Sequence, residues 1–280
     1  MKKKFSRFLA LALVLVFAIS GCASGTGKSS GDNAGGSGSP TMDRIQASGK
    51  IRIGIDVNGP PMGFRDDSGN MQGYDVDWAN KLAEVLGVEA EFTEVNGETR
   101  IPYLTSDRVD VIFCNITGNL ERAKSIDFSI PYLRAGIKML TAAGSPLHTL
   151  EDLNDPSVTV CVSHGTTGEE LVLTHAPKAN LVYVSTFAEQ LLQLEQGKCD
   201  ATFEDSSLID YAAGSSNGKL EAQPEMYTSD PICIGTQKGD AEWTRYLDMF
   251  VSWMISSGYQ AEEYEKWWGV PFDGHLTTLW

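Results

Sequence analysis

The order of strand and helix patterns is the feature of this sequence that most constrains its fold. Short apolar runs rich in Val and Ile, such as residues 50–57 and 109–113, indicate strands. They alternate with amphipathic segments such as 75–87, in which Leu82 and Leu86 recur at helical spacing. Alternation of this kind predicts mainly parallel sheets with helices on their faces.

The alternation occurs in two sets along the chain. The expected strands are 50–57, 90–95 and 109–113 in the first set, and 158–163, 181–184 and 199–205 in the second. The other expected elements are a hairpin in 63–76, helices over 99–106 and 241–257 and from Thr166 and Thr186, and a late strand over 232–237. We therefore expect an α/β chain built from two similar units.

The first residues resemble a secretory leader. A basic start precedes an apolar run over 8–19, which is too short to span a bilayer but suits the core of a signal peptide. The run ends in Ile-Ser-Gly-Cys, which resembles a lipobox, so we expect a signal peptide over 1–21 and a lipid on Cys22. The alternative is an ordinary secretory signal with a chance cysteine.

A flexible tether is expected over 22–42, because 11 of the 20 residues in 23–42 are Gly or Ser. The folded part should begin at Asp43. Removal of the leader changes the net charge from −15 to −19, since 18 Lys and Arg then face 37 Asp and Glu. This acidity argues against a nucleic-acid partner. The four remaining cysteines lack CxxC spacing, which argues against a zinc site.

Polar residues follow the strand at 109–113, at the edge where open parallel sheets bind ligands. Asn119 or Thr117 can cap a helix that carries Arg122, and this combination suits a carboxylate. The alternative is that Arg122 lies on a helix surface and pairs with an acid such as Glu121.

The second unit repeats this chemistry. The stretch SHGTTGEE, residues 163–170, has a capping-box pattern and places another helix N-terminus at a strand end. The strand at 199–205 brings Glu204 and Asp205 to the same edge, where an acid can hold an ammonium group. Each feature could also be a plain helix cap. Together, a carboxylate-binding set and an ammonium-binding acid predict that a zwitterion binds between the two units.

At the level of whole motifs, the sequence resembles the polar amino-acid-binding proteins of ABC importers, which are type II periplasmic binding proteins. The motifs, in the family's order, are GKIRIGIDVNGPPMGFRDDSGNMQGYDVDWANKLAEVLG, RIPYLTSDRVDVIF, NLERAKSIDFSIPY, SHGTTGEE and GKCDATFED. The resemblance covers residues 51–269. It implies a lipid-anchored monomer on the extracytoplasmic face of the cell membrane that hands a free amino acid to the permease, with no cofactor or metal.

The resemblance also implies the architecture. Each of two lobes would hold a mainly parallel sheet flanked by helices, and two crossover strands would join the lobes. Lobe 1 would comprise residues 43–133 and 232–280, and lobe 2 would comprise residues 134–231. The lobes would close on the ligand like a hinge.

Site residues follow from the same resemblance. Arg122 would clamp the α-carboxylate, Thr117 would add its hydroxyl and N–H, and Thr167 would supply a helix-terminal donor. Asp205 would take the α-ammonium, aided by the carbonyl of Asn115.

Side-chain selectivity is less directly implied. Asp56 matches a position that faces the cationic side chain in binders of basic amino acids, although it could instead cap the turn at Asn58. Gly59 and Gly97 stand where many members have aromatic rings, and Asn115 replaces a smaller residue. We expect a roomier pocket and favour a basic ligand of the arginine, lysine or ornithine type.

Two disulfides, Cys114–Cys233 and Cys161–Cys199, are hypotheses that the expected strand order suggests, with core packing as the alternative. The main competing function is an enzyme on the same fold, because the resemblance extends to cyclohexadienyl dehydratases. Glu204 and His164 could then serve as acid or base. A ligand-sensing accessory protein is a third possibility.

Overall fold

The computed structural model describes residues 38–272 of the chain. The predictions that fall on residues 1–37, namely the signal peptide over 1–21, the lipidation of Cys22 and most of the tether, lie outside the described residues. Among the residues that are described, no helix has both the length and the apolar character needed to cross a membrane.

The first sheet has five strands in the order β5-β1-β6-β15-β7. They are β5 (Glu89–Glu94), β1 (Lys50–Ile55), β6 (Val111–Phe113), β15 (Gly235–Gln237) and β7 (Ile126–Phe128). Strand β1 runs parallel to β5 and β6, whereas β15 is antiparallel to β6 and β7. Helices α2 (Tyr74–Leu86) and α3 (Arg100–Thr105) pack against this sheet. We call this part lobe 1.

The second sheet also has five strands, in the order β11-β10-β12-β9-β13. They are β11 (Asn180–Val184), β10 (Thr159–Ser163), β12 (Ala201–Asp205), β9 (Ile137–Ala142) and β13 (Leu220–Met226). Strand β10 runs parallel to β11 and β12, and β9 is antiparallel to β12 and β13. Helices α5 (Thr167–His175), α6 (Phe187–Glu195) and α7 (Ser206–Ser215) pack on it. We call this part lobe 2.

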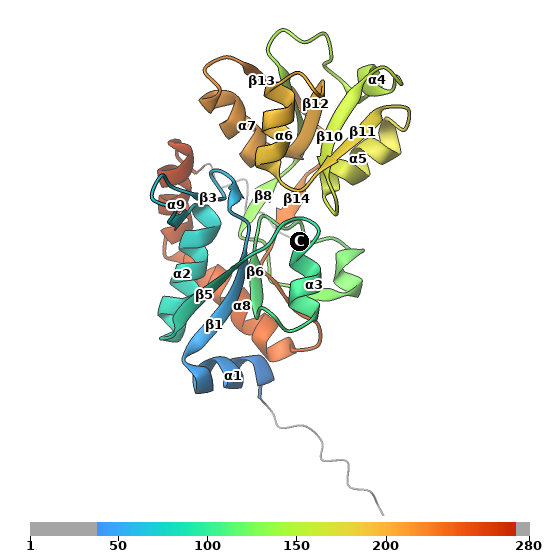
Figure 1. The fold of residues 1–280 in the computed structure, drawn as a ribbon. Coiled ribbons are helices and arrows are strands. Elements are labelled where there is room, and N and C mark those ends of the chain that lie inside the picture. The colour runs from blue at the N-terminus through green and yellow to red at the C-terminus, as the bar shows by residue number, and fades with distance from the viewer. Residues whose placement is uncertain (1–37, 273–280) are drawn as a thin grey trace, which may run out of the picture. The chain divides into compact units, whose positions relative to one another are not determined.

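Two strands connect the sheets (Figure 1). The chain passes from the first sheet to the second through β8 (Leu133–Ala135) and returns through β14 (Asp230–Ile232), and the two strands pair antiparallel. The predicted α/β fold, with two helix-flanked sheets and two crossover strands, is confirmed.

The remaining elements complete the two lobes. They are α1 (Pro40–Ser48), the small sheet of β2 (Asn58–Gly59), β3 (Gly63–Arg65) and β4 (Met71–Gln72), the 3-10 turn η1 (Arg122–Lys124), α4 (Leu150–Leu153), α8 (Ala241–Ser256) and α9 (Tyr259–Trp268).

Apolar clusters pack against both sheets. The largest contains Ile53 of β1, Trp78 of α2 and Trp243 of α8, all fully buried, and it extends into lobe 2 at residues such as Leu140 and Phe187. In lobe 2, Phe203 of β12 and Val172 of α5 are fully buried in another. The alternating apolar runs of the sequence therefore supply these cores, and the strand ends remain available for polar residues.

Three predicted elements differ in the structure. The folded part begins earlier than Asp43, because Ser39 caps α1 and Pro40 takes its first position, a start signal hidden in Gly/Ser-rich sequence. The late strand over 232–237 is divided between β14 and β15. The helix predicted to carry Arg122 is only one 3-10 turn, so it offers no helix dipole to a ligand.

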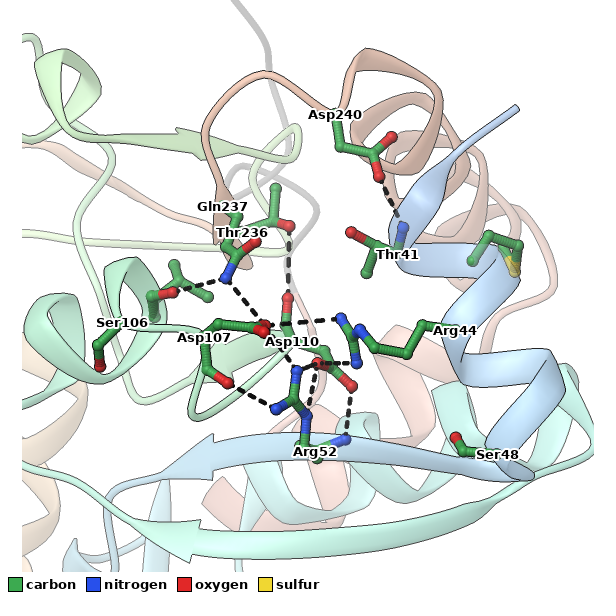
Figure 2. Close-up of polar contacts among 12 residues, drawn as sticks. Thr41, Arg44, Ser48, Arg52, Ser106, Asp107, Asp110, Thr236, Gln237 and Asp240 are labelled. Atoms are coloured by element: carbon green, nitrogen blue, oxygen red, sulfur yellow. Dashed lines mark hydrogen bonds and ion pairs between the residues drawn. The ribbon is translucent and has the colours of Figure 1, made fainter. Parts of the chain in front are cut away.

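A charged cluster attaches α1 to lobe 1 (Figure 2). Asp110, which is 1% exposed, accepts the Arg52 Nε–H at 2.9 Å and lies 2.6 Å from Arg44 Nη1. Arg52 Nη2 also lies 2.7 Å from Asp107 Oδ1. The buried charge of Asp110 is thus shared by arginines from α1 and β1, which anchors the first helix of the folded part.

Asp240 joins the N-termini of two helices, and its loss should destabilise the fold. Its Oδ2 accepts from Ser39 Oγ at 2.7 Å and from the Thr41 N–H at 3.1 Å, and its Oδ1 accepts from the Trp243 N–H at 3.0 Å. Asp240→Ala removes the cap of α8 and two hydrogen bonds at the start of α1, so we expect a loss of about 2 kcal/mol in the free energy of unfolding. Urea unfolding measures it, with Asp67→Ala at an exposed position as the control. A change as small as that of the control would contradict this role.

Candidate ligand-binding site

The carboxyl ends of β1, β6, β10 and β12 meet at one pocket between the two lobes. It is a cavity of about 50 Å³ whose lining includes five predicted site residues: Asp56, Asn115, Thr117, Thr167 and Asp205. Three further charged residues also line it: Asp75 and Arg100, which the sequence did not single out, and Glu204, which it placed at the same edge as Asp205. The pocket thus lies beyond the carboxyl ends of parallel strands, where ligands bind in open sheets.

Asp205 and Asn115 form a contact across the pocket. Asn115 Nδ2 donates to Asp205 Oδ2 at 2.7 Å, which joins lobe 1 to lobe 2. The Oδ1 atoms of both side chains are buried and have no hydrogen-bond partner. Two unsatisfied acceptors at one place are costly unless a donor arrives. This end of the pocket is therefore suited to a group that carries several N–H donors.

Burial controls the protonation of the pocket acids. It raises the pKa of Asp205 to about 7, with a further contribution from the charge of Asp230, and it raises the pKa of Asp75 to about 7. For Glu204, burial and then the charge of Asp205 raise the pKa to about 8. Burial also raises the pKa of Asp56. The four acids lie close together and are shielded from water, so a bound cation would favour their ionised forms.

Asn115 is held by an acid that the sequence reasoning missed. Its backbone has φ 48°, a left-handed conformation that Asn tolerates better than most residues. Its N–H donates to Asp75 Oδ2 at 2.8 Å, and the Tyr132 hydroxyl donates to Asp75 Oδ1. Asp75 lies at the start of α2, where it resembles an ordinary first-turn acid, so local sequence did not reveal its role.

Glu204 belongs to a buried network in lobe 2. Gln190 Nε2 donates to Glu204 Oε1 at 3.2 Å and to Ser163 Oγ at 2.8 Å, and the Thr202 hydroxyl donates to Gln190 Oε1. The amide of Gln190, fully buried on α6, thereby holds the Glu204 carboxyl at the floor of the pocket.

Replacing Glu204 with Gln should stabilise the ligand-free protein at pH values above the ordinary pKa of a carboxyl group. The unfolded chain ionises this group near 4.5 and the folded chain near 8, so folding binds a proton in that window and stability falls as pH rises through it. We expect Glu204→Gln to add about 2 kcal/mol at pH 6 and almost nothing at pH 4.

Urea unfolding at the two pH values measures this difference. Glu195→Gln, at an exposed position of α6, is the matched control. An equal effect of Glu204→Gln at pH 4 and pH 6 would contradict the raised pKa.

Arg122 lies beside the pocket rather than in its lining. Its Nη1 donates to the Thr117 carbonyl at 2.8 Å and its Nη2 donates to the Gly165 carbonyl of lobe 2 at 2.9 Å. Burial, and then the charge of Arg100, lower the pKa of Arg122 to about 10. Asn119 accepts the Arg122 N–H at 2.9 Å, as predicted for a cap, although the element is a single turn. The carboxylate role of Arg122 stays a prediction.

Arg100 is the second arginine at the site, and no sequence signal marked it. It is 7% exposed, at the first position of α3. Its Nη1 donates to the Cys114 carbonyl and its Nη2 to the Gly165 carbonyl, each at 3.2 Å, while its buried Nε has no partner. Arg100 and Arg122 therefore converge on the same carbonyl of lobe 2.

Thr117 and Thr167 come from opposite lobes. Thr117 is 3% exposed and bridges Ile232 at the return to lobe 1. Thr167 opens α5, after Thr166 accepts the Glu169 N–H at 3.1 Å as the N-cap. The predicted capping box is incomplete, because Glu169 Oε2 accepts from the Gly165 N–H rather than from Thr166.

Asp56 has one of the two roles that the sequence left open, the turn cap, and its role toward a ligand side chain stays a prediction. Its Oδ1 accepts from the backbone N–H of Asn58 at 3.0 Å and from Asn58 Nδ2 at 3.1 Å, which is the turn cap. It also lines the pocket.

The expectation of a roomier pocket is wrong. A Cβ at Gly59 would lie 3.1 Å from Leu208 Cδ2, and one at Gly97 would lie 2.7 Å from the His164 carbonyl oxygen. Residues of lobe 2 therefore occupy the space that aromatic side chains fill in many members of the family. Gly97 instead permits the lobes to approach backbone to backbone.

The structure bears on the hypothesised disulfides and on metal binding. Cys114, Cys161, Cys199 and Cys233 are free, buried thiols, so neither hypothesised disulfide is present. Burial raises the pKa of Cys114 and of Cys233 to about 12, which makes both poor nucleophiles. Within residues 38–272, no cluster of three or more His, Cys, Asp or Glu could hold a metal ion.

Residues 51–270 match the profile of the bacterial extracellular solute-binding proteins, family 3. The chain belongs to this family. It is thus a solute-binding protein that acts outside the cytoplasm. It is 31% identical over 272 residues to the ABC transporter glutamine-binding protein GlnH of Bacillus subtilis, a match that covers 95% of this chain and 97% of that protein.

Two other relatives bear on the function. The cyclohexadienyl dehydratase of Pseudomonas aeruginosa is 28% identical over 237 residues, which cover 81% of this chain and 85% of the enzyme. An ancestral arginine-binding protein has been solved bound to arginine and bound to glutamine. In both forms it is 31% identical, has a TM-score of 0.74, and is matched over 79% of this chain and 99% of its own.

Proposed function

We propose that this solute-binding protein captures a free α-amino acid between its lobes and delivers it to the transmembrane subunits of an ABC importer. The observation that carries the proposal is the polarity of the pocket. Asp205 and Asn115 present unsatisfied acceptors in the lining, Arg100 lines the same pocket, and Arg122 lies beside it. A zwitterion complements both the acceptors and the guanidinium groups.

The ammonium would bind at Asp205 and Asn115. Its three N–H donors can satisfy both orphaned Oδ1 atoms, and its charge favours the ionised form of Asp205. Ionising Asp205 at neutral pH costs little free energy, because its pKa is about 7 in the ligand-free protein.

The carboxylate would bind at Arg122, with Thr117 and the start of α5 at Thr167. Arg122 now donates to two carbonyls. A carboxylate accepts stronger, charge-assisted hydrogen bonds than a carbonyl does, so it can displace the Gly165 oxygen from the guanidinium. Because Arg122 and Asp205 lie on different lobes, the ligand would stabilise the closed state by contacting both.

The ligand side chain would meet the acids on the remaining wall. Asp56 and Glu204 line this part, and both are acceptors when ionised. They favour a side chain that donates hydrogen bonds, and the basic type predicted from Asp56 meets that condition. The arginine- and glutamine-bound forms of the ancestral relative support a donor-bearing side chain in a similar fold.

A calorimetric screen tests the function. The purified protein is unfolded and refolded to remove bound ligand, and is then titrated with each amino acid, ornithine, citrulline and cystine. We expect at least one of them to bind with a selective, saturable heat. Absence of binding by any amino acid would contradict the proposal.

A dehydratase is the second candidate, because Glu204 is a buried acid with a pKa of about 8 at the floor of the pocket. A cyclohexadienyl dehydratase assay on the purified protein tests it. His164 does not support this alternative, since it is exposed, stacks on Tyr183 and does not line the pocket. We favour transport because the glutamine-binding ABC transporter protein is matched over 95% of this chain and 97% of its own, against 81% and 85% for the dehydratase.

We also propose that a lipid on Cys22 holds the protein at the outer face of the cell membrane. Cys22→Ser should therefore shift the protein from the membrane fraction to the soluble fraction, since one residue carries the anchor. Fractionation followed by immunoblotting measures the shift, with Ser24→Ala as the control. Membrane retention of Cys22→Ser equal to that of the control would contradict the anchor.

A further inference from the structure

Asp75 is a buried acid of lobe 1 to which the proposed function gives no role. It is 1% exposed, lies at the start of α2 and lines the pocket. Its carboxylate accepts from two neutral donors, one on each oxygen: the backbone N–H of Asn115 at 2.8 Å and the Tyr132 hydroxyl. Burying a carboxylate against neutral donors costs free energy of folding, so its position asks for a reason other than stability.

The first donor belongs to the residue through which lobe 1 reaches lobe 2. Asn115 Nδ2 donates to Asp205 Oδ2 of lobe 2 at 2.7 Å. The backbone of Asn115 has φ 48°, a conformation that persists in a residue other than glycine where neighbouring contacts hold it. The bond from its N–H to Asp75 is such a contact. Asp75 therefore fixes the residue that touches the other lobe.

The second donor belongs to the start of the crossover between the lobes. Tyr132 immediately precedes β8, and its N–H donates at 2.9 Å to the carbonyl of Ile232, the last residue of β14. The loop after β6, which carries Asn115, is attached to the same residue, because Thr117 bridges Ile232. Asp75 thus closes a ring of contacts that joins the pocket loop to both crossover strands.

We infer that Asp75 is a positioning residue that couples the pocket to the crossover strands, so that the contact of Asn115 with lobe 2 and the arrangement of these strands change together. The inference rests on the proposed function and adds to it a connection between ligand capture and the hinge. A carboxylate suits this place, because each of its oxygens can accept from a different donor. An asparagine offers one acceptor and would turn an NH2 donor toward the second donor.

Asp75→Asn is expected to weaken amino-acid binding about tenfold or more, because one of the two buried donors loses its acceptor. Titration calorimetry measures the dissociation constant, with the amino acid that binds tightest in the screen described above. Asp110→Asn is the control, since Asp110 is also a 1% exposed acid of lobe 1 but pairs with Arg44 and Arg52, away from the pocket. It should leave the dissociation constant unchanged, whatever it does to stability.

Tyr132→Phe tests the coupling without changing the acid, because it removes the hydroxyl and leaves Asp75 bonded to Asn115. We expect this variant to weaken binding about threefold or more. In the double variant with Asp75→Asn, the loss should be no larger than in Asp75→Asn alone, since both substitutions break the same connection. Independent contributions to the stability of lobe 1 would not produce this non-additivity in the dissociation constant.

The outcomes separate the inference from the proposed function. A dissociation constant of Asp75→Asn within about threefold of that of the unmodified protein would overturn the inference and leave amino-acid binding intact. Loss of affinity in Asp75→Asn with none in Tyr132→Phe, or losses that add in the double variant, would mean that Asp75 acts on Asn115 alone, which also overturns the coupling. Failure of the unmodified protein to bind any amino acid would overturn the function itself, and the inference with it.

Discussion

Asp205→Asn is expected to weaken amino-acid binding by about 2–5 kcal/mol, or roughly 30-fold to several thousandfold. The substitution keeps the size of the side chain and removes the only carboxylate that the proposal assigns to the ammonium. Asp205 Oδ1 is buried and unpartnered in the ligand-free protein, so little else there can compensate. Calorimetric dissociation constants for the best ligand found in the screen give the loss directly.

A deaminated analogue of that ligand makes the test specific. If Asp205 binds the ammonium, Asp205→Asn should leave the affinity for the deaminated analogue almost unchanged. The exposed Asp67→Asn serves as the control for a general loss of acidic charge. Equal losses for the amino acid and for the analogue would mean that Asp205 acts through lobe closure, by its bond to Asn115, and not through the ammonium.

Arg122→Ala is expected to weaken binding by about 2–5 kcal/mol, because it leaves a desolvated carboxylate without its charged partner. The structure adds a second way in which Arg122 could matter, since its bond to the Gly165 carbonyl joins the lobes. A loss of less than about tenfold, or ~1.4 kcal/mol, would contradict both roles.

The carboxamide derivative of the ligand, which lacks the α-carboxylate, separates the two roles. A clamp on the carboxylate predicts that Arg122→Ala has little effect on this derivative. A closing contact predicts the same loss for both compounds. Arg245→Ala, at an exposed position, is the control and should change neither affinity.

Much of the fold could be predicted because it depends on local pattern. The strand at 50–57 and the helix at 75–87 correspond to β1 and α2 within two residues at each end. Their apolar residues recur with the period of a strand or a helix, and that period is present in the sequence whatever surrounds it. The start of α1 was missed because its cap, Ser39, depends on Asp240, which lies 201 residues away in the sequence.

The pocket-lining residues that the sequence predicted are mainly those that end or follow strands. Asn115, Thr117 and Asp205 follow β6 or end β12, and their position relative to a strand indicates the binding edge. Arg100 and Asp75 lie on helices whose patterns reveal only which face is apolar. One acceptor of Arg100, the Gly165 carbonyl, belongs to the other lobe and is 65 residues away in the sequence. Local sequence carries no trace of such a contact.

The glycines show the same limit. The sequence predicted extra room in the pocket at Gly59 and Gly97, yet Leu208 and the backbone at His164 fill that space. By itself, then, the sequence determined the elements, their order and the edge at which polar groups collect, because these depend on periodicity and on residues near one another in the chain. Only the tertiary structure decided which charges face each other and how much room remains, because both depend on contacts between lobes that are distant in sequence.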